Sequence, residues 1–164
     1  MAGKINLVTN KQLQRRTTKK LDNIIYNNFI DLAQEPNLKH TYNEINRLLN
    51  SADLRFFTYI YNTKLISYLI AEIMILPDKR KVLFVNYLFS SPKFRGKGIA
   101  TKLLEAAEHY AKINKFSGIM LTCNTHDISV YEFYLKRGFM LDIYLRQYTK
   151  YDVLFKPMDI NTKI

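Results

Sequence analysis

Apolar and polar residues follow two spacings along this chain, and each spacing predicts a different kind of element. Apolar residues in short runs or at every second position predict β-strands over residues 4–9, 54–61, 65–76, 82–89 and 119–123. Apolar residues three and four positions apart predict amphipathic helices over about 17–35, 41–50, 98–114 and 128–136. Residues 139–148 and 151–155 are expected to form a final pair of strands. The order of these elements predicts one α/β domain of the α+β type over residues 1–164.

Turn and capping residues set the expected boundaries of several elements. Thr17 or Thr18 is expected to cap the first helix, and Pro36 is expected to end it. Turn residues at 62–64 and 77–78 separate the three central strands. Such turns are typical of hairpins, so we expect this part of the sheet to be antiparallel.

Composition narrows the classes of protein that fit. The 164 residues are 48% hydrophobic and 13% aromatic, so the chain can bury a core and is not broadly disordered. The single cysteine, Cys123, excludes an internal disulfide, and with three scattered histidines we expect no metal site. No apolar leader follows Met1, and the longest apolar run, 65–76, is too short to span a bilayer. We therefore expect a soluble cytoplasmic protein without a membrane partner.

The net charge points to an anionic partner without identifying it. The chain has 25 Lys and Arg residues against 14 Asp and Glu residues, a formal charge of +11. A nucleic acid, an anionic cofactor or a need for solubility would each account for such a charge. The densest basic cluster, Lys11 to Lys20, is not accompanied by an RNA-binding aromatic motif or by zinc-finger spacing. Nucleic-acid binding is therefore the least favoured function.

One segment combines small and basic residues between a strand and a helix. Its sequence is Arg95-Gly96-Lys97-Gly98-Ile99-Ala100. Glycine lets a backbone approach a ligand closely, and free N–H groups at the start of a helix attract phosphate. Gly-x-Gly by itself fits an ordinary strand-to-helix turn equally well. The segment lacks the glycine spacing of a dinucleotide-binding fold and the Gly-Lys-Ser/Thr end of a P-loop.

This segment resembles the pyrophosphate loop, Arg/Gln-x-x-Gly-x-Gly/Ala, of the GNAT superfamily of N-acetyltransferases. A second segment, Val130 to Phe139, is similar to the family's A-x-x-F-Y-x-x-x-G-F motif and departs from it only at Val130. The order of elements from Lys4 to Met158 also resembles that of the family. The resemblance implies a GNAT-like domain, with a mixed and mostly antiparallel sheet of about six to seven strands, splayed central strands and flanking helices.

The resemblance also implies how acetyl-CoA, the expected cosubstrate, would bind. The backbone of Leu88 to Ser90 would pair with the pantetheine arm much as an added strand would. The N–H groups of the glycine-rich segment would hold the pyrophosphate. The full set of expected cofactor-binding residues is Leu88, Phe89, Ser90, Arg95, Gly96, Lys97, Gly98, Ile99, Ala100, Thr101, Asn124, Asp127, Tyr131 and Tyr134.

In the family an amine attacks the thioester directly, and a tyrosine protonates the departing thiolate. Tyr134 matches that tyrosine, although packing on a short helix is the alternative reading. Cys123 is expected to be a buried thiol rather than a nucleophile. Seven residues before the tyrosine the family often has asparagine, where this chain has Asp127. Asp127 fits a helix N-cap as well as a cofactor contact.

The base that would activate the amine has no direct match in this sequence. The family's glutamate on the fourth strand corresponds to Phe84. Glu72, on the neighbouring strand, is the catalytic replacement favoured by charge and location, and a carboxylate outside the cleft is an equal alternative. His126 and water are the remaining candidates.

These observations predict an N-acetyltransferase that acts on a primary amine. A small amine such as a polyamine or an aminoglycoside is slightly favoured over a protein N-terminus or lysine. A polyamine would require an acidic patch, for which Glu35, Glu44, Asp53 and Glu72 are candidates. The alternatives are a non-catalytic module that keeps the CoA-binding fold, which Phe84 supports, and a basic nucleic-acid-binding protein. A homodimer is left open.

Overall fold

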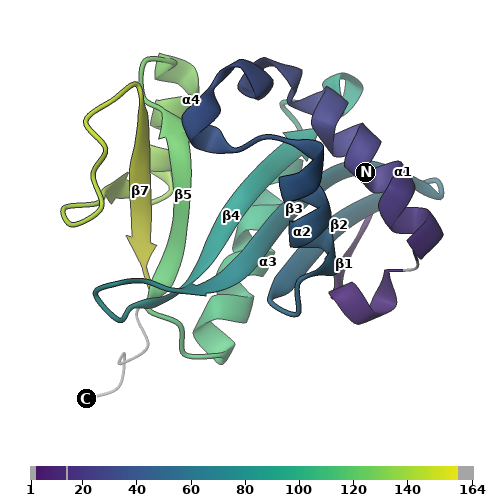
Figure 1. The fold of residues 1–164 in the computed structure, drawn as a ribbon, viewed down its shortest axis with the longest axis horizontal. Helices are drawn as coiled ribbons and strands as arrows, with labels where there is room; N and C mark the ends of the chain where they lie inside the picture. The colour runs from purple at the N-terminus through teal and green to yellow at the C-terminus, as the bar shows by residue number, and fades with distance from the viewer. Residues whose placement is uncertain (1–2, 14, 159–164) are drawn as a thin grey trace.

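The computed structural model describes residues 3–13 and 15–158, without the side chains of residues 15–18. These residues form one seven-stranded sheet with helices on both faces (Figure 1). The strands are β1 (Lys4–Val8), β2 (Leu54–Tyr61), β3 (Lys64–Ile75), β4 (Lys81–Ser90), β5 (Gly118–Asn124), β6 (Met140–Leu141) and β7 (Tyr151–Pro157). The α-helices are α1 (Arg15–Asn28), α2 (Tyr42–Asn50), α3 (Ile99–Ile113) and α4 (Ile128–Lys136).

The sheet is mixed and mostly antiparallel, as expected. Its strand order is β1-β2-β3-β4-β5-β7-β6, and only the β4–β5 pair is parallel. Both predicted hairpins are confirmed, because β2 pairs with β3 and β3 with β4 in antiparallel register. Asn62 and Thr63 join β2 to β3 with φ values of 49° and 60°, and positive φ at both positions suits a two-residue hairpin turn.

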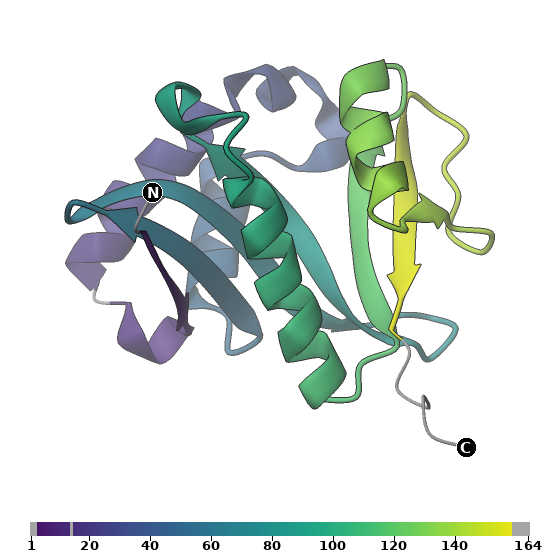
Figure 2. The same ribbon diagram turned by 180° about the vertical axis from the view of Figure 1, so that it is seen from behind.

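The helices divide between the two faces of the sheet. Helices α1 and α2 lie on one face (Figure 1), and α3 and α4 lie on the other (Figure 2). The predicted apolar face of α3 is buried against the sheet through Leu103, Leu104, Ala107 and Ala111. The apolar side of α2 forms a second core with α1 on the opposite face. Burial of these two helix faces fixes the sheet between two layers of helices.

Strands β4 and β5 separate part of the way along their length. Their parallel pairing ends at Val85–Leu121, whereas β4 continues to Ser90 and β5 to Asn124. At the same place β4 contains a bulge, because Ile70 pairs with Tyr87 and Ala71 with Val85, which leaves Asn86 as an extra residue. A bulge bends its strand. Among the described residues, no strand pairs with the β5-facing edge of β4 beyond Val85.

The predicted boundaries of the first helix are wrong. Helix α1 begins at Arg15, so Thr17 and Thr18 lie inside it rather than at its N-cap. It ends at Asn28, and two short 3₁₀ turns follow, Ile30–Gln34 and Pro36–Leu38. Pro36 therefore begins a turn instead of ending a helix. A proline fits the first position of a helical turn because its missing N–H would have no partner there.

The strand predicted over 139–148 is also wrong, because only Met140–Leu141 pairs with β7. The carboxylate of Asp142 accepts the backbone N–H groups of Tyr144 and Leu145, at 3.2 and 2.7 Å. These N–H groups are therefore satisfied by a side chain rather than by a neighbouring strand. The segment between β6 and β7 is consequently a loop.

Two further expectations from the sequence concern membrane-spanning segments and the basic cluster near the N-terminus. In the part of the chain that the structure describes, no helix is long and apolar enough to cross a membrane. The basic cluster from Lys11 to Lys20 runs into α1, and its side chains at 14–18 fall outside the described residues.

Candidate active site

A cleft of about 690 Å³ lies between the end of β4, the start of α3 and α4. It is on the face of the sheet that α3 and α4 cover (Figure 2). The two segments of the GNAT resemblance, far apart in the sequence, meet here. The lining residues are Leu88, Ser90, Phe94, Arg95, Gly96, Gly98, Ile99, Ala100, Thr101, Ser129, Val130, Phe133, Tyr134 and Arg137.

The glycine-rich loop presents backbone N–H groups to this cleft. Gly96 and Gly98 have φ values of 74° and 78°, in the left-handed region that side-chain-bearing residues rarely adopt. A Cβ at either position would meet no atom within 4 Å, so the loop needs these glycines for their conformation. From Gly96 to Thr101 no backbone N–H donates to another described residue. The start of α3 therefore offers a set of free donors suited to an anion.

Two arginines line the cleft, one at the start of this loop and one at the end of α4. Arg95 donates through Nε to the carbonyl oxygen of Ser90 at 2.9 Å. Arg137, the C-cap residue of α4, donates through Nε and Nη2 to the hydroxyl oxygen of Thr101, at 3.1 and 2.7 Å. Its Nη1 donates to the carbonyl of Phe133 at 2.7 Å. Arg137 thus links α4 to the first turn of α3 across the cleft.

Sequence reasoning missed several residues of the cleft. Arg137 is the most consequential, because it adds to the cleft a second guanidinium that lies outside the glycine-rich loop. A signal for it was present, since Arg137 follows Tyr134 by three residues and directly precedes Gly138, which places it at the end of the helix that contains Tyr134. The others are Phe94, Ser129, Val130 and Phe133.

Tyr134 lies at the inner end of the cleft. Burial raises the pKa of its phenol well above the ordinary value of about 10, and the proximity of Cys123 adds to the shift. The hydroxyl therefore keeps its proton at neutral pH. Tyr134 also lines a second cavity, of about 380 Å³, together with Leu88 and Val130. These three residues separate the cleft from that cavity.

We call the second cavity the inner cavity, and a third, of about 260 Å³, the outer cavity. The inner cavity reaches from Tyr134 and Cys123 to Phe29, and the outer cavity continues to His40, in the segment that joins α1 to α2, and to Glu44 of α2. The residues common to both are Leu32, Val85, Asn86, Tyr87 and Thr122. The cleft, the inner cavity and the outer cavity are therefore neighbours in a row that runs from one face of the sheet to the other, beside the place where β4 and β5 separate.

The structure places five of the expected cofactor-binding residues outside the lining of the cleft. Asn124 and Asp127 line the inner cavity, and Asp127 is the N-cap of α4. Lys97 is exposed and does not line the cleft. The side chain of Phe89 belongs to the core on the α1 and α2 face. Tyr131 lines a separate surface cavity, which it shares with His126.

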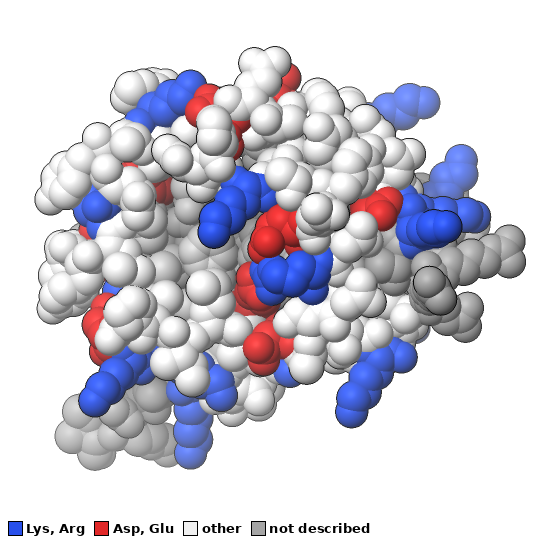
Figure 3. Space-filling view, in the orientation of Figure 1, with Lys and Arg blue, Asp and Glu red and all other residues white. Residues whose placement is uncertain are grey.

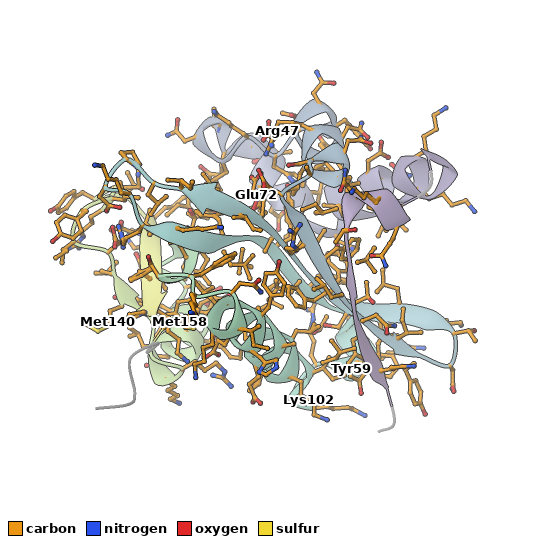
Figure 4. The ribbon with its side chains drawn as sticks, turned by 90° about the horizontal axis from the view of Figure 1, so that it is seen from below. Arg47, Tyr59, Glu72, Lys102, Met140 and Met158 are labelled. Atoms are coloured by element: carbon orange, nitrogen blue, oxygen red, sulfur yellow. The ribbon has the colours of Figure 1, made fainter. Side chains whose placement is uncertain are left out.

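Glu72 is held in an ion-pair network with α2. Its two carboxylate oxygens accept from Nη2 and Nη1 of Arg47, at 3.0 and 3.2 Å, and Glu44 accepts from Nε of the same arginine at 2.6 Å. Figure 4 shows Arg47 beside Glu72, on the side of the sheet opposite Lys102 of α3. Glu72 lines neither the cleft nor the two cavities, although its cross-strand neighbour Phe84 lines the outer cavity. Its role as the base stays a prediction.

The four candidate acidic residues do not form one patch. Glu44 and Glu72 come together, but around Arg47. Glu35 pairs with Lys150 at 2.9 Å, and Asp53 lies in the turn before β2. In Figure 3 acidic and basic side chains lie next to one another near the middle of the α1 and α2 face.

The thiol of Cys123 is buried, with 3% of the residue exposed. Burial raises its pKa to about 11, and the charge of Asp127 adds to the shift. The sulfur is therefore a neutral thiol at physiological pH, and a thiol is a poor nucleophile. No group of three His, Cys, Asp or Glu side chains among the described residues could hold a metal ion.

Comparisons with known proteins agree with this arrangement. The model of the acetyltransferase (GNAT) family matches residues 20–139. An acyl-CoA N-acyltransferase from Pseudomonas aeruginosa has a TM-score of 0.71 at 15% identity, with 94% of this chain and 99% of that chain covered. A PaiA N-acetyltransferase from Thermoplasma acidophilum in complex with coenzyme A has a TM-score of 0.63 at 18% identity, with 94% and 99% covered. NAA60 from Arabidopsis thaliana in complex with acetyl-CoA has a TM-score of 0.66 at 15% identity, with 93% and 97% covered.

At such identities the solved structures show a shared fold, whereas the family model shows membership. No curated protein matches the sequence. The match to the family model covers most of the chain and includes both the glycine-rich loop and the segment around Tyr134. The chain therefore belongs to the GNAT family of acetyltransferases, which use acetyl-CoA as the acetyl donor.

Proposed function

We propose that this protein transfers the acetyl group of acetyl-CoA to a small primary amine, which attacks the thioester directly. One observation carries the proposal. Tyr134 lines the cleft that contains the glycine-rich loop and also the inner cavity that leads to the opposite face of the sheet. A donor in the cleft and an acceptor in the cavities would therefore meet beside Tyr134.

The cleft fits the donor at both ends. The free N–H groups from Gly96 to Thr101 suit the pyrophosphate, and the guanidinium groups of Arg95 and Arg137 add positive charge beside them. Further in, no strand of the described residues pairs with the β5-facing edge of β4 beyond Val85. The amide groups of a pantetheine arm can pair with such an edge in the manner of an added strand.

Tyr134 is the proposed general acid. As the amine nitrogen forms its bond to the carbonyl carbon, the carbon–sulfur bond breaks and the sulfur takes the phenolic proton. The nitrogen loses a proton as it becomes an amide, and the phenolate of Tyr134 takes up a proton in return, so the products are the neutral amide, CoA thiol and the restored phenol. The raised pKa of Tyr134 ensures that this proton is present at neutral pH. The buried thiol of Cys123 supports direct attack rather than an acetylated enzyme.

The acceptor side favours a small amine over a polyamine. The inner and outer cavities have volumes of about 380 and 260 Å³. Glu44 lines the outer cavity, but Arg47 already neutralises part of its charge. The cavity also contains Lys39, a cation that would repel a polycationic acceptor.

Calorimetry followed by an acceptor screen tests this function. We expect acetyl-CoA to bind with micromolar affinity and at least one small primary amine to release CoA in its presence. The screen should include aliphatic amines, an aminoglycoside, a polyamine and a peptide with a free N-terminus. Product mass should increase by one acetyl group.

The alternatives give different results in the same experiments. A non-catalytic CoA-binding module would bind acetyl-CoA and release no CoA with any amine. A nucleic-acid-binding protein would bind an oligonucleotide with a steep dependence on salt and would not bind acetyl-CoA. Release of CoA with the peptide alone would replace the small amine by a protein acceptor.

A further inference from the structure

A buried histidine faces the outer cavity from the segment between α1 and α2. Only 4% of His40 is exposed. Its Nε2 lies 3.0 Å from the carbonyl oxygen of Tyr26, and its Nδ1 lies 2.7 Å from the hydroxyl oxygen of Tyr87. A carbonyl oxygen can only accept, so Nε2 must be the protonated nitrogen of the neutral ring. The lone pair is then on Nδ1, which accepts from Tyr87.

Tyr87 connects this histidine to the reaction route. It follows the bulge residue Asn86 on β4, immediately before Leu88, which lines the cleft. It lines both the inner cavity that Tyr134 borders and the outer cavity that His40 borders. Tyr87 therefore lies between the proposed point of attack and the lone pair of His40.

The surroundings hold the two rings in place. The ring of His40 stacks on Tyr26 of α1, with centroids 5.0 Å apart and planes 10° apart. The ring of Phe29 packs against the ring of Tyr87, with centroids 4.8 Å apart. The charged residues on the same cavity are Lys39 and Glu44. The carboxylate of Glu44 is the group that would offset a positive charge formed on His40.

We propose that Tyr87 and His40 act as a pair that removes the proton from the acceptor amine. The amine proton passes to the hydroxyl oxygen of Tyr87 as the hydroxyl proton passes to Nδ1 of His40. The products are a neutral amine and an imidazolium, so the charge is conserved and Tyr87 ends as a neutral phenol. Tyr87 is the residue that contacts the substrate, and His40 is a positioning residue that acts through it. This inference rests on the proposed function.

Two observations support the pair over the alternatives. Burial, together with the proximity of Tyr68 and the charge of Glu44, raises the pKa of Tyr87 far above its ordinary value. Tyr87 is consequently a neutral phenol that donates a hydrogen bond to His40. It can accept a proton from the amine only if it gives its own proton to His40 in the same step. Glu72, in contrast, is committed to Arg47 through both oxygens.

Two substitutions test the pair by different means. Tyr87→Phe keeps the ring that packs on Phe29 and removes the hydroxyl. In His40→Asn the amide oxygen can still accept from Tyr87 but takes up no proton at neutral pH. Each should lower kcat by at least about tenfold at pH 7 with the best amine of the screen, since a positioned base contributes roughly 10²–10⁴-fold. Acetyl-CoA affinity should stay within about twofold of wild type.

The pH dependence separates a proton-accepting role from a structural one. The loss should shrink as the pH approaches about 10, where an aliphatic amine gives up its proton to solvent. A structural role would lower kcat equally at every pH. Tyr59→Phe is the matched control, because Tyr59 is a buried tyrosine in the core on the opposite face, accepts from the backbone N–H of Gly3 and lines none of the cavities described above. It should retain wild-type kcat.

The outcomes distinguish this inference from the function on which it rests. A wild-type protein that acetylates no amine would overturn both. An active wild type, with both variants within twofold of it across the pH range, would overturn the pair and leave the function standing. If kcat of both variants is lowered by the same factor at every pH, then Tyr87 and His40 have a structural role and the pair is overturned. A tenfold loss in Glu72→Gln that is greatest at low pH, with Tyr87→Phe unaffected, would return the role of base to Glu72.

Discussion

The backbone N–H of Phe139 donates to the carbonyl oxygen of Tyr134 at 3.2 Å, and the two rings meet edge to face with centroids 5.5 Å apart. Between them Gly138 has a φ of 91° and donates to the carbonyl of Leu135 at 3.1 Å. This pair of bonds is a Schellman motif, which requires a left-handed residue at the end of a helix. Tyr134 is thus held by its backbone and its ring, and its hydroxyl makes no hydrogen bond to another described residue.

Removal of that hydroxyl should therefore affect chemistry alone. In Tyr134→Phe we expect kcat to fall at least about tenfold, because a positioned general acid contributes roughly 10²–10⁴-fold. The melting temperature and the affinity for acetyl-CoA should change little. Steady-state kinetics, calorimetry and thermal melting measure the three quantities. A kcat within twofold of wild type would mean that the thiolate leaves without this proton.

The glycine-rich loop can be tested with two substitutions at one position. Gly96→Ala adds the strain of a positive φ, about 1–2 kcal/mol, and should weaken acetyl-CoA binding by no more than about thirtyfold. Gly96→Glu adds a negative charge beside the expected phosphates and should abolish binding. Both can be measured by calorimetry. Full affinity in the glutamate variant would remove the loop from the cofactor site.

Arg137 is expected to bind a phosphate as well as to link two helices. Arg137→Ala should weaken acetyl-CoA binding by at least about tenfold, since hydrogen bonds to charged groups contribute about 1.5–3 kcal/mol. Thr101→Val removes the internal acceptor of the guanidinium and leaves its charge in the cleft, so it should cost less affinity. If both variants lose stability equally and keep full affinity, then Arg137 acts only as a link.

Asp142 should make stability depend on pH. Burial alone would raise its pKa, but the Arg80 guanidinium and the N–H groups of Leu145 and Tyr144 outweigh burial and lower it. A lowered pKa in the folded state stabilises the protein above the ordinary range of an aspartate, about 3.9, and this contribution is lost as the pH falls through the folded-state value. The difference in melting temperature between wild type and Asp142→Asn should be largest at neutral pH and should narrow as the pH falls below the ordinary aspartate range and through the lowered folded-state pKa. A constant difference would contradict this account.

Local sequence signals predicted much of the fold and part of the site. The central strands and α2, α3 and α4 lie within a few residues of their expected ranges, because periodicity and turn residues act over short distances. The glycine-rich loop and Tyr134 belong to one cleft, as the two motifs implied. Asp127 at the N-cap of α4 and Gly138 after its end are likewise set by neighbouring residues.

Features that depend on distant partners were not predictable. Arg47 and Glu72 are 25 positions apart, and no local pattern around either residue predicts that they form an ion pair. His40 and Tyr87 are 47 positions apart. The strand after Leu141 was overestimated because its alternating apolar residues resemble a strand, whereas the carboxylate of Asp142 binds the N–H groups that a strand would need.

The gap between β4 and β5 has a consequence for the order in which molecules arrive and leave. The cleft lies on the α3 and α4 face, and the outer cavity lies on the other, against α2 and the segment that joins α1 to α2. A donor bound in the cleft would leave the acceptor's route open, and an acetylated amine could depart while CoA is still bound. Both substrates could thus occupy the protein at once, and double-reciprocal plots of its initial rates should intersect rather than run parallel. An enzyme that carries the acyl group on a nucleophile of its own would instead release CoA before the amine reacts, and its plots would run parallel.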